Sequence, residues 1–515
     1  MPLNPTAVLH YELLLRGGEI ADGTGAPLTA GDIGITGGRI RLLAPGTAAT
    51  ADQVVDVSGL VVTPGFIDAH THSDETTLNG TGDEQAHAAV LQGVTVEVCG
   101  NCGDSAFPGP YPDFAAFADA HASVGRANHL ASLVGHGTLR AAVVGHAARP
   151  ATAAELAEMC EVLDRDFTAG AAGLSTGLIY TPGSYADTAE VTALATVAAR
   201  HRKPYVTHLR DEMSRVEEAL AEAVAIAQAS GAPLHVSHHK TAGKYGWGGT
   251  ERTLPRLERL RAEGMDLTCD VYPYTAASTA LAAMLPPWAH DGGPERLLER
   301  LRDAGERARM RTAIAEGVPG WENTVGNGGW DRISVAGAAR HRALQGRTIA
   351  DIAEERGADA LDVVAELLLA EDGDVTIISH SMREDDVQRV LRTPFAMIGS
   401  DGVPKPGLPH PRWAGTFARV LGHYARDLQL LSIQEAVRKM TGATAARFNL
   451  VGRGVVRDGA HADLVVLDPA TVADRATFAE PLLTPVGIHM VLVAGEVVVR
   501  DGAVTGARPG RVLAC

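Results

Sequence analysis

Two histidines, His70 and His72, stand one residue apart at the end of the mainly apolar segment Thr63–Ala69. If this segment is a strand, residues two apart point to the same face, so both imidazoles can reach one metal ion. A polar turn explains an isolated His-x-His pair about equally well. The metal interpretation therefore depends on further ligands elsewhere in the chain.

Four other strand-like runs end in or beside a residue type that binds zinc. They are Tyr205–His208 and Leu234–His238, which end in histidine, Phe395–Asp401, which ends in aspartate, and Val94–Cys99, which is followed by Cys102. Histidine nitrogen, thiolate and carboxylate are the ligand set of zinc. Packing alone does not explain such endings at the same position of several strands. The sequence therefore predicts a zinc site built from these strand ends.

Cys99 and Cys102 form a Cys-x-x-Cys pair that we interpret as one core residue and one ligand. A redox pair or half of a zinc knuckle also has this spacing, but no second Cys-x-x-Cys completes a knuckle. Cys99 lies inside the strand pattern, whereas Cys102 follows the turn. Cys102 is therefore the predicted ligand.

Other histidines near strand ends receive different assignments. In a strand His235 faces away from His238, so we expect it to be structural. His239 is a candidate for supporting a ligand or contacting substrate. His136 and His380 are expected to be structural.

The predicted ligands need a scaffold that brings strand ends together. Between residues 63 and 450, strand-like runs alternate with helix-like stretches, and further strands are expected at Asp266–Tyr272 and Val375–Ser379. This alternation is typical of a parallel sheet, and the length suits a TIM-like (β/α)₈ barrel, in which catalytic groups lie at the carboxyl ends of the strands. The stretch near 286–331 interrupts the alternation, and we expect it to be an insertion over the barrel mouth.

Both ends of the chain are rich in short strands separated by turn signals. The clearest runs are Glu12–Arg16, Asp32–Thr36 and Arg39–Leu43 near one end, with Gly17-Gly18 and Gly37-Gly38 as turns, and Ala462–Asp468 and His489–Val499 near the other. We expect residues 1–62 and 451–515 to build one small β-sandwich domain together. The predicted fold class is therefore α/β, a barrel with a second β-domain.

Composition excludes some partners. The net charge of −17 over 515 residues argues against nucleic acid or an anionic membrane surface as the main partner. No apolar run is long enough to span a bilayer, and the first residues lack the pattern of a signal peptide. Five sparse cysteines favour reduced thiols and a cytoplasmic protein.

A set of motifs resembles the amidohydrolase superfamily and, within it, the D-aminoacylase family of N-acyl-D-amino-acid deacylases. The stretches that carry the resemblance are Pro64–His72, Gly100–Gly103, Gly173–Leu178 with Tyr180, Thr207–Arg210, Ser237–Lys240, Asp270–Thr275, Gly399–Gly402, His410–Arg412, Val472–Phe478 and Gly506–Arg511. The resemblance extends over essentially the whole chain. The resemblance implies zinc as cofactor and an N-acyl-D-amino acid as substrate.

The resemblance also implies a role for individual residues. Cys102, His208 and His238 would hold the tighter zinc, and His70, His72 and Asp401 would form a second, weaker position that shares Cys102. The positions that would contact the substrate are Tyr180, Lys240, Tyr272, Ser278 and Arg412. Asp401 suits the proton transfer that amide hydrolysis requires.

The expected reaction is hydrolysis of the amide bond, which releases a carboxylate and a free D-amino acid. The run that contains Leu281, Met284 and Leu285 predicts a pocket for neutral or hydrophobic side chains. The alternatives are an N-acyl-D-glutamate deacylase, a dihydropyrimidinase-like cyclic amidase and a catalytically silent scaffold. Hydantoinase-like relatives carry a carboxylated bridging lysine in place of the thiolate, and a silent scaffold would not be expected to keep every ligand.

Overall fold

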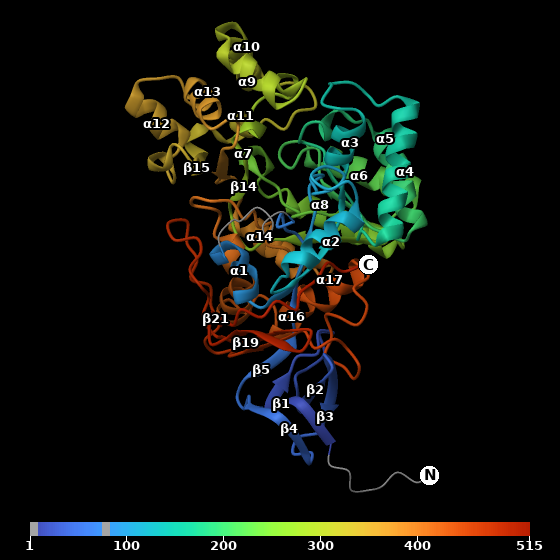
Figure 1. The fold of residues 1–515 in the computed structure, drawn as a ribbon. Helices are drawn as coiled ribbons and strands as arrows, with labels where there is room; N and C mark the ends of the chain where they lie inside the picture. The colour runs from blue at the N-terminus through green and yellow to red at the C-terminus, as the bar shows by residue number, and fades with distance from the viewer. Residues whose placement is uncertain (1–8, 75–82) are drawn as a thin grey trace.

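Strands from both ends of the chain form one nine-stranded sheet. The computed structural model describes residues 9–74 and 83–515. The sheet contains β1 (Leu9–Ile20), β2 (Thr29–Thr36), β3 (Arg39–Leu43), β4 (Ala49–Asp56), β5 (Val61–Pro64), β18 (Leu464–Leu467), β19 (Ile488–Val493), β20 (Glu496–Arg500) and β21 (Ala503–Val504). Antiparallel pairing of β5 with β18 joins strands from the two ends of the chain, and β5 lies next to β19 in Figure 1.

The predicted turn at Gly17-Gly18 is wrong, because β1 continues through both glycines to Ile20. The register between β1 and β2 shifts between Leu15 and Gly18, which marks an irregularity of the β-bulge type. Gly17 has a φ of 81°, a value that favours glycine, and its N–H donates to Asp32 Oδ1. The predicted turn at Gly37-Gly38 is present.

The centre of the molecule contains two parallel sheets. One has the order β17 (Ala396–Ile398), β13 (Leu267–Val271), β12 (Leu234–Val236), β11 (Tyr205–His208), β10 (Leu174–Gly177) and β9 (Val134–Gly135). The other has the order β6 (Phe66–Asp68), β7 (Val94–Cys99) and β8 (His129–Ser132). Backbone hydrogen bonds connect the two sheets on both sides, from Leu133 N to Cys99 O at 2.9 Å and from Ala69 N to Ile398 O at 3.2 Å.

Helices alternate with these strands, so the fold is α/β. Helices that connect neighbouring strands of the larger sheet include α5 (Thr188–Arg200), α6 (Val216–Ser230) and α8 (Thr250–Ala262). The Asp187 side chain accepts from Glu190 N and caps the start of α5, and Gly231 ends α6 in a left-handed conformation. No helix in the described ranges is long and apolar enough to cross a membrane.

Further helices surround the two sheets. They are α1 (Asp83–Leu91), α2 (Phe114–Val124), α3 (His136–Val143), α4 (Ala153–Ala169), α7 (Gly243–Gly246), α14 (Glu384–Arg392), α15 (Arg412–Arg419), α16 (Ile433–Met440) and α17 (Gly442–Arg447). The buried faces of several of them join the strands in the largest hydrophobic core. This core fixes the strands whose ends carry the predicted ligands.

A separate unit lies at the opposite end of the molecule from the nine-stranded sheet (Figure 1). It consists of β14 (Ala277–Ala280), α9 (Pro294–Arg302), α10 (Ala304–Glu316), α11 (Thr324–Gly328), β15 (Ile333–Gly337), α12 (Ile349–Arg356), α13 (Ala360–Ala370) and β16 (Thr376–Ser379). It has its own hydrophobic core, and the stretch predicted to be an insertion, 286–331, falls within it. β16, which we expected among the alternating strands of the parallel sheet, instead pairs antiparallel with β14 and β15.

Candidate metal centre

The predicted ligands lie at or just beyond the carboxyl ends of parallel strands. His70 and His72 follow β6, Cys102 follows β7, His208 is the last residue of β11, His238 follows β12 and Asp401 follows β17. Parallel strands direct these ends to one edge of the fold. Residues more than 300 positions apart in the chain therefore meet in one place.

Cys102 lies at the centre of three imidazoles. Its Sγ is 3.3 Å from His70 Nε2, 3.7 Å from His208 Nδ1 and 3.4 Å from His238 Nε2. All four residues are buried. One thiol and three ring nitrogens directed at it are the donor chemistry of a zinc site, so the residues present fit a bound transition metal.

A second group of possible ligands adjoins the first. Asp401 Oδ1 lies 3.6 Å from His70 Nε2 and 3.3 Å from His72 Nε2. The donor atoms of these three residues all lie within 4.8 Å of one another. His70 belongs to both groups, so the two groups of possible ligands adjoin through one imidazole.

Two buried carboxylates hold the outer nitrogens of the histidines. Glu212 Oε1 lies 3.1 Å from His238 Nδ1, and Glu212 Oε2 lies 3.4 Å from His208 Nε2. Asp270 Oδ2 lies 3.4 Å from His70 Nδ1. Asp270 Oδ2 therefore accepts from His70 Nδ1, which faces away from Cys102, while the Glu212 carboxylate lies at ion-pair distance from the outer nitrogens of His208 and His238. Lys240 Nζ also lies 2.8 Å from His238 Nδ1.

The sequence interpretation missed Glu212 and Asp270. A signal existed for each, because Glu212 follows His208 by four residues and Asp270 lies near the end of a strand. His235, predicted to be structural, contacts Asp270 Oδ2 at 2.9 Å and thus helps to place this carboxylate.

Three of the predicted ligands have an unusual backbone conformation. The φ angles of Cys102, His238 and Asp401 are 53°, 32° and 51°. Residues other than glycine rarely occupy this left-handed region, and each instance costs on the order of 1–3 kcal/mol. The surrounding fold holds all three side chains toward the same point in spite of this cost.

Burial keeps the imidazoles of His70 and His208 neutral. Burial lowers the pKa of His70 to about 4 and lowers the pKa of His208 well below its usual value. Burial raises the pKa of the Cys102 thiol. Neutral imidazoles are competent ligands, whereas the thiol must lose its proton to a cation that binds.

Asp401 remains ionised although it is buried. Burial raises the pKa of its carboxyl, but the positive charge of Arg412 and the contacts with His70 and His72 outweigh this effect and hold the pKa well below its usual range. Arg412 Nη1 lies 3.0 Å from Asp401 Oδ2. An ionised carboxylate at this position can accept a proton.

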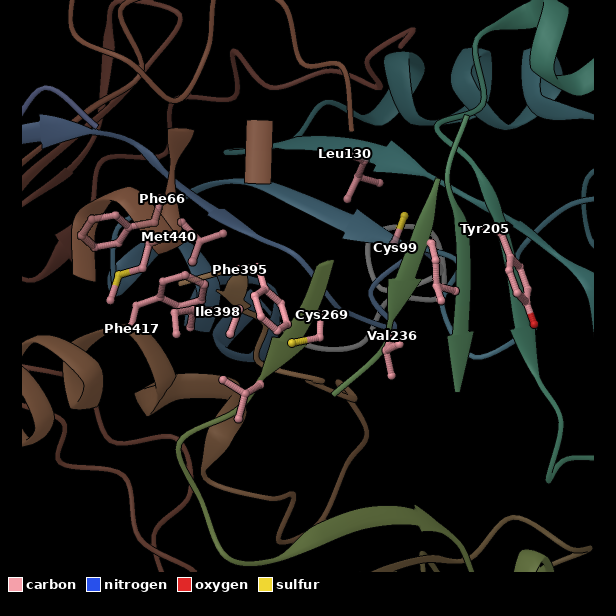
Figure 2. Close-up of a cluster of buried hydrophobic side chains, with 14 of the residues drawn as sticks. Phe66, Cys99, Leu130, Tyr205, Val236, Cys269, Phe395, Ile398, Phe417 and Met440 are labelled. Atoms are coloured by element: carbon pink, nitrogen blue, oxygen red, sulfur yellow. The ribbon is translucent and has the colours of Figure 1, made fainter. Parts of the chain in front are cut away.

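Cys99 lies apart from the ligand groups. Its side chain is buried in β7 within the hydrophobic core that also contains Leu130, Tyr205 and Val236 (Figure 2). Its Sγ lies 3.8 Å from the carbonyl oxygen of Ala131. Among the described residues, the groups able to hold a metal include Cys102 but not Cys99.

A cavity of about 880 Å³ opens over the cluster. Its walls include His72, Cys102, His208, His238 and Asp401, together with four of the predicted substrate contacts, Tyr180, Lys240, Tyr272 and Ser278. The fifth contact, Arg412, is fully buried, and its Nη2 donates to the Ser278 carbonyl oxygen at 3.4 Å. The Lys240 Nζ and the Arg412 guanidinium lie 5.7 Å and 4.6 Å from the centre of the Tyr272 ring.

One prediction about the cavity needs correction. Leu281 and Leu285 are buried in the core of the separate unit and are not among the residues that line the cavity, whereas Ala280 and Met284 of the same run do line it. The Lys240 Nζ lies 2.6 Å from Glu212 Oε2.

Three other histidines near strand ends, His136, His239 and His380, make contacts outside the metal centre. His239 lies 2.9 Å from Thr253 Oγ1 and is not among the residues that line the cavity. His136 pairs with Glu190 at 2.8 Å, and the His380 ring packs against Phe478. These contacts give each of the three a structural role.

Comparison with known proteins identifies the family to which the chain belongs. A sequence model of the amidohydrolase family matches residues 53–499, so the chain belongs to the amidohydrolase family. It is 40% identical to the D-aminoacylase of Alcaligenes xylosoxydans xylosoxydans, over 98% of each chain.

Solved structures of D-aminoacylase and of a related deacylase are also similar to this chain. A D-aminoacylase structure, determined to study its binuclear metal centre, has a TM-score of 0.83 and 38% identity, covering 98% of this chain and 99% of the other. An N-acyl-D-glutamate deacylase from Bordetella bronchiseptica, complexed with zinc and a phosphonate inhibitor that mimics the tetrahedral intermediate, has a TM-score of 0.84 and 36% identity, covering 98% and 100%.

Proposed function

We propose that this protein is a zinc-dependent deacylase of N-acyl-D-amino acids. The single observation that carries the proposal is the convergence of three inner imidazole nitrogens on Cys102 Sγ at 3.3–3.7 Å inside a cavity. The names of the similar proteins supply the substrate class and the D configuration. The intact donor set argues against a silent scaffold.

Cys102, His208 and His238 are proposed to hold the tighter zinc. His70, His72 and Asp401 are proposed to form the weaker position, with Cys102 shared. The described relative with a binuclear centre and the relative complexed with zinc support this assignment. The outer-nitrogen contacts of Glu212 support it further, because they orient two of the three tight ligands at once.

The scaffold is proposed to be a closed eight-stranded barrel. Its order would be β6, β7, β8 with β9, β10, β11, β12, β13 and β17, closed by the Ala69–Ile398 hydrogen bond. Residues 63–450 would then form the barrel domain with its insertion. Residues 1–62 and 451–515 would form the second, β-sandwich domain, which the β5–β18 pairing supports.

Amide hydrolysis requires an activated water, a polarised carbonyl and a protonated leaving amine. Zinc, when bound, lowers the pKa of water to about 7 and acts as a Lewis acid toward a carbonyl oxygen. Asp401 accepts a proton from the attacking water at its carboxylate and delivers it to the amide nitrogen as the C–N bond breaks. Arg412 favours this role because its positive charge keeps Asp401 ionised before the reaction.

The substrate α-carboxylate is proposed to lie between Arg412 and Lys240. Both cations flank the Tyr272 ring, and Ser278 lies beside them. Charge-assisted hydrogen bonds from a guanidinium and an ammonium hold a carboxylate firmly. Tyr180, whose hydroxyl accepts from Thr279 Oγ1 at 3.1 Å, also lines the cavity.

Neutral side chains are the proposed preference. The two lysines that line the cavity each pair with a carboxylate, Lys240 with Glu212 and Lys405 with Asp374. Apolar wall residues include Ile179, Met284 and Val375. An acidic side chain would therefore meet little net positive charge in this cavity. A cyclic amidase of the dihydropyrimidinase type is disfavoured because the bridging position carries a thiol.

The zinc-loaded protein should hydrolyse N-acetyl-D-Met, N-acetyl-D-Leu and N-acetyl-D-Phe faster than N-acetyl-D-Glu, and all of them faster than their L enantiomers. Two anchored groups, the α-carboxylate and the acyl carbonyl, leave one direction for the side chain, so the two enantiomers cannot bind alike. Amine release from a panel of N-acetyl amino acids measures this. A clear preference for N-acetyl-D-Glu would contradict the assigned pocket.

Replacing Glu212 by glutamine should weaken zinc binding about 10- to 100-fold, the usual effect of removing a carboxylate that orients a metal-bound histidine. Competition with a chromogenic chelator measures the affinity. Glu222→Gln is the matched control, because Glu222 pairs with Arg210 and does not contact His208 or His238. Equal zinc affinity in the two variants would refute the role of Glu212.

A further inference from the structure

His410 connects the start of α15 to the segment before β14. Its Nδ1 accepts a hydrogen bond from Arg412 N at 3.0 Å, and its Nε2 lies 3.0 Å from the carbonyl oxygen of Ala276. A backbone N–H only donates, so Nδ1 carries no proton and Nε2 donates its proton to Ala276. One imidazole therefore holds together two segments that lie 134 positions apart in the chain.

The ring of His410 is enclosed by its neighbours. Only 3% of the residue is exposed, and the rings of Tyr274 and Phe478 pack against it with centroids 5.2 Å and 5.1 Å away. Burial lowers the pKa of His410 well below its usual value, so the ring is neutral. One tautomer in one orientation therefore makes both hydrogen bonds.

Arg412 depends on this ring for the placement of its backbone. It is the first residue of α15, and Pro411 at the helix N-cap supplies no side-chain hydrogen bond. The first N–H groups of a helix have no partner inside the helix, and His410 provides one for Arg412. The Arg412 guanidinium reaches the same segment, because its Nη2 donates to the carbonyl oxygen of Ser278, two residues after Ala276.

The Arg412 guanidinium also keeps a donor for an anion. Its Nε is buried and has no hydrogen-bond partner among the residues that the structure describes. A buried donor without a partner is costly, and a substrate carboxylate would supply the missing acceptor. The position of this donor relative to Ser278, which lines the cavity, therefore matters for binding.

We propose, on the basis of the deacylase function above, that His410 is a positioning residue that holds Arg412 in place for the substrate α-carboxylate. His410 is not among the residues that line the cavity, so it acts through Arg412. Without its ring, the first turn of α15 loses its attachment to the segment that carries Ser278. The two groups proposed to face the α-carboxylate then no longer keep a fixed separation.

His410→Phe keeps a ring of similar size and removes both hydrogen bonds. The kcat/KM for N-acetyl-D-Met, divided by that for N-acetyl-D-methioninamide, which lacks the α-carboxylate, should fall about three- to thirtyfold in the zinc-loaded variant, the range expected when a charge-assisted contact is displaced. The amide is assayed both as a substrate and as a competitor of N-acetyl-D-Met, so slow turnover of the amide still gives an affinity. Zinc content should be unchanged.

His410→Asn should keep the ratio within about threefold of the wild-type value, because an asparagine side chain readily accepts from the backbone N–H two residues on. It can therefore replace His410 Nδ1 as the acceptor for Arg412 N. Asparagine fills less space than the ring, so this recovery separates the placement of Arg412 from general packing. If circular dichroism shows that His410→Phe does not fold, His410→Gln replaces it, since the longer side chain carries its amide group past the Arg412 N–H.

His129→Phe is the matched control. His129 is also buried, its Nδ1 also accepts from a backbone N–H, that of Arg511 at 3.1 Å, and it is not among the residues that line the cavity. This variant should leave the ratio unchanged. An unchanged ratio in His410→Phe, or an equal fall in His410→Asn or His129→Phe, would overturn the proposal. Wild-type protein that hydrolyses no N-acyl-D-amino acid would instead refute the deacylase function itself.

Discussion

Replacing Cys102 by alanine should remove the bound zinc and lower hydrolysis by at least about a hundredfold, because the variant loses the donor at which three imidazoles converge. The remaining histidines would keep their contacts with Glu212 and Asp270. The fold should therefore persist without the metal. Metal content by atomic emission, activity on N-acetyl-D-Met and circular dichroism together measure this outcome.

Cys99→Ala is the control for the same experiment. Cys99 is three residues away and equally a thiol, but its side chain packs in the hydrophobic core and its Sγ faces the Ala131 carbonyl. This variant should keep zinc and activity, with at most a loss of stability typical of a small buried side chain. Loss of zinc in Cys99→Ala together with retention in Cys102→Ala would reverse the assignment.

Asp401→Asn should lower kcat by about a hundredfold or more while most of the zinc stays bound. The asparagine keeps the shape of the side chain but cannot accept and return a proton. Cys102, His208 and His238 remain in place, so the tighter metal position is preserved. Steady-state kinetics and metal content on the same preparation separate loss of proton transfer from loss of metal.

Asp474→Asn is a suitable comparison for Asp401→Asn. Asp474 also pairs with an arginine, Arg419, at 3.3 Å, but it is not among the residues that line the cavity. It should leave kcat near the wild-type value. Near-normal turnover in Asp401→Asn would remove this residue from the mechanism.

The local sequence pattern predicts helices and strands well where the apolar positions are the buried ones. The strand expected at Tyr205–His208 has those bounds in the structure, and the helix-like stretch before it is the helix Thr188–Arg200. Both are short, strongly patterned segments, and Asp187 supplies a cap at the start of the helix. Strand ends also carried the predicted ligands, because parallel strands place equivalent ends at one edge.

Contacts between distant segments were not predictable in the same way. β16 has a strand-like sequence, but its antiparallel partners β14 and β15 are set by the fold of the separate unit. The positions of Glu212, four residues after His208, and of Asp270, near a strand end, were visible in the sequence, but their contacts with the rings of His208, His238 and His70 depend on the fold. Leu281 and Leu285 face the second core rather than the cavity, because a 3₁₀ turn at Leu281–Met284 sets their direction.

The most direct test of the account is zinc-dependent hydrolysis of one enantiomer. Protein freed of metal by a chelator is assayed on N-acetyl-D-Met and N-acetyl-L-Met, before and after zinc is restored. The account predicts no turnover without zinc, release of D-methionine once zinc is restored, and far slower release of L-methionine. Full activity in the metal-free protein, or equal rates on the two enantiomers with zinc, would contradict it.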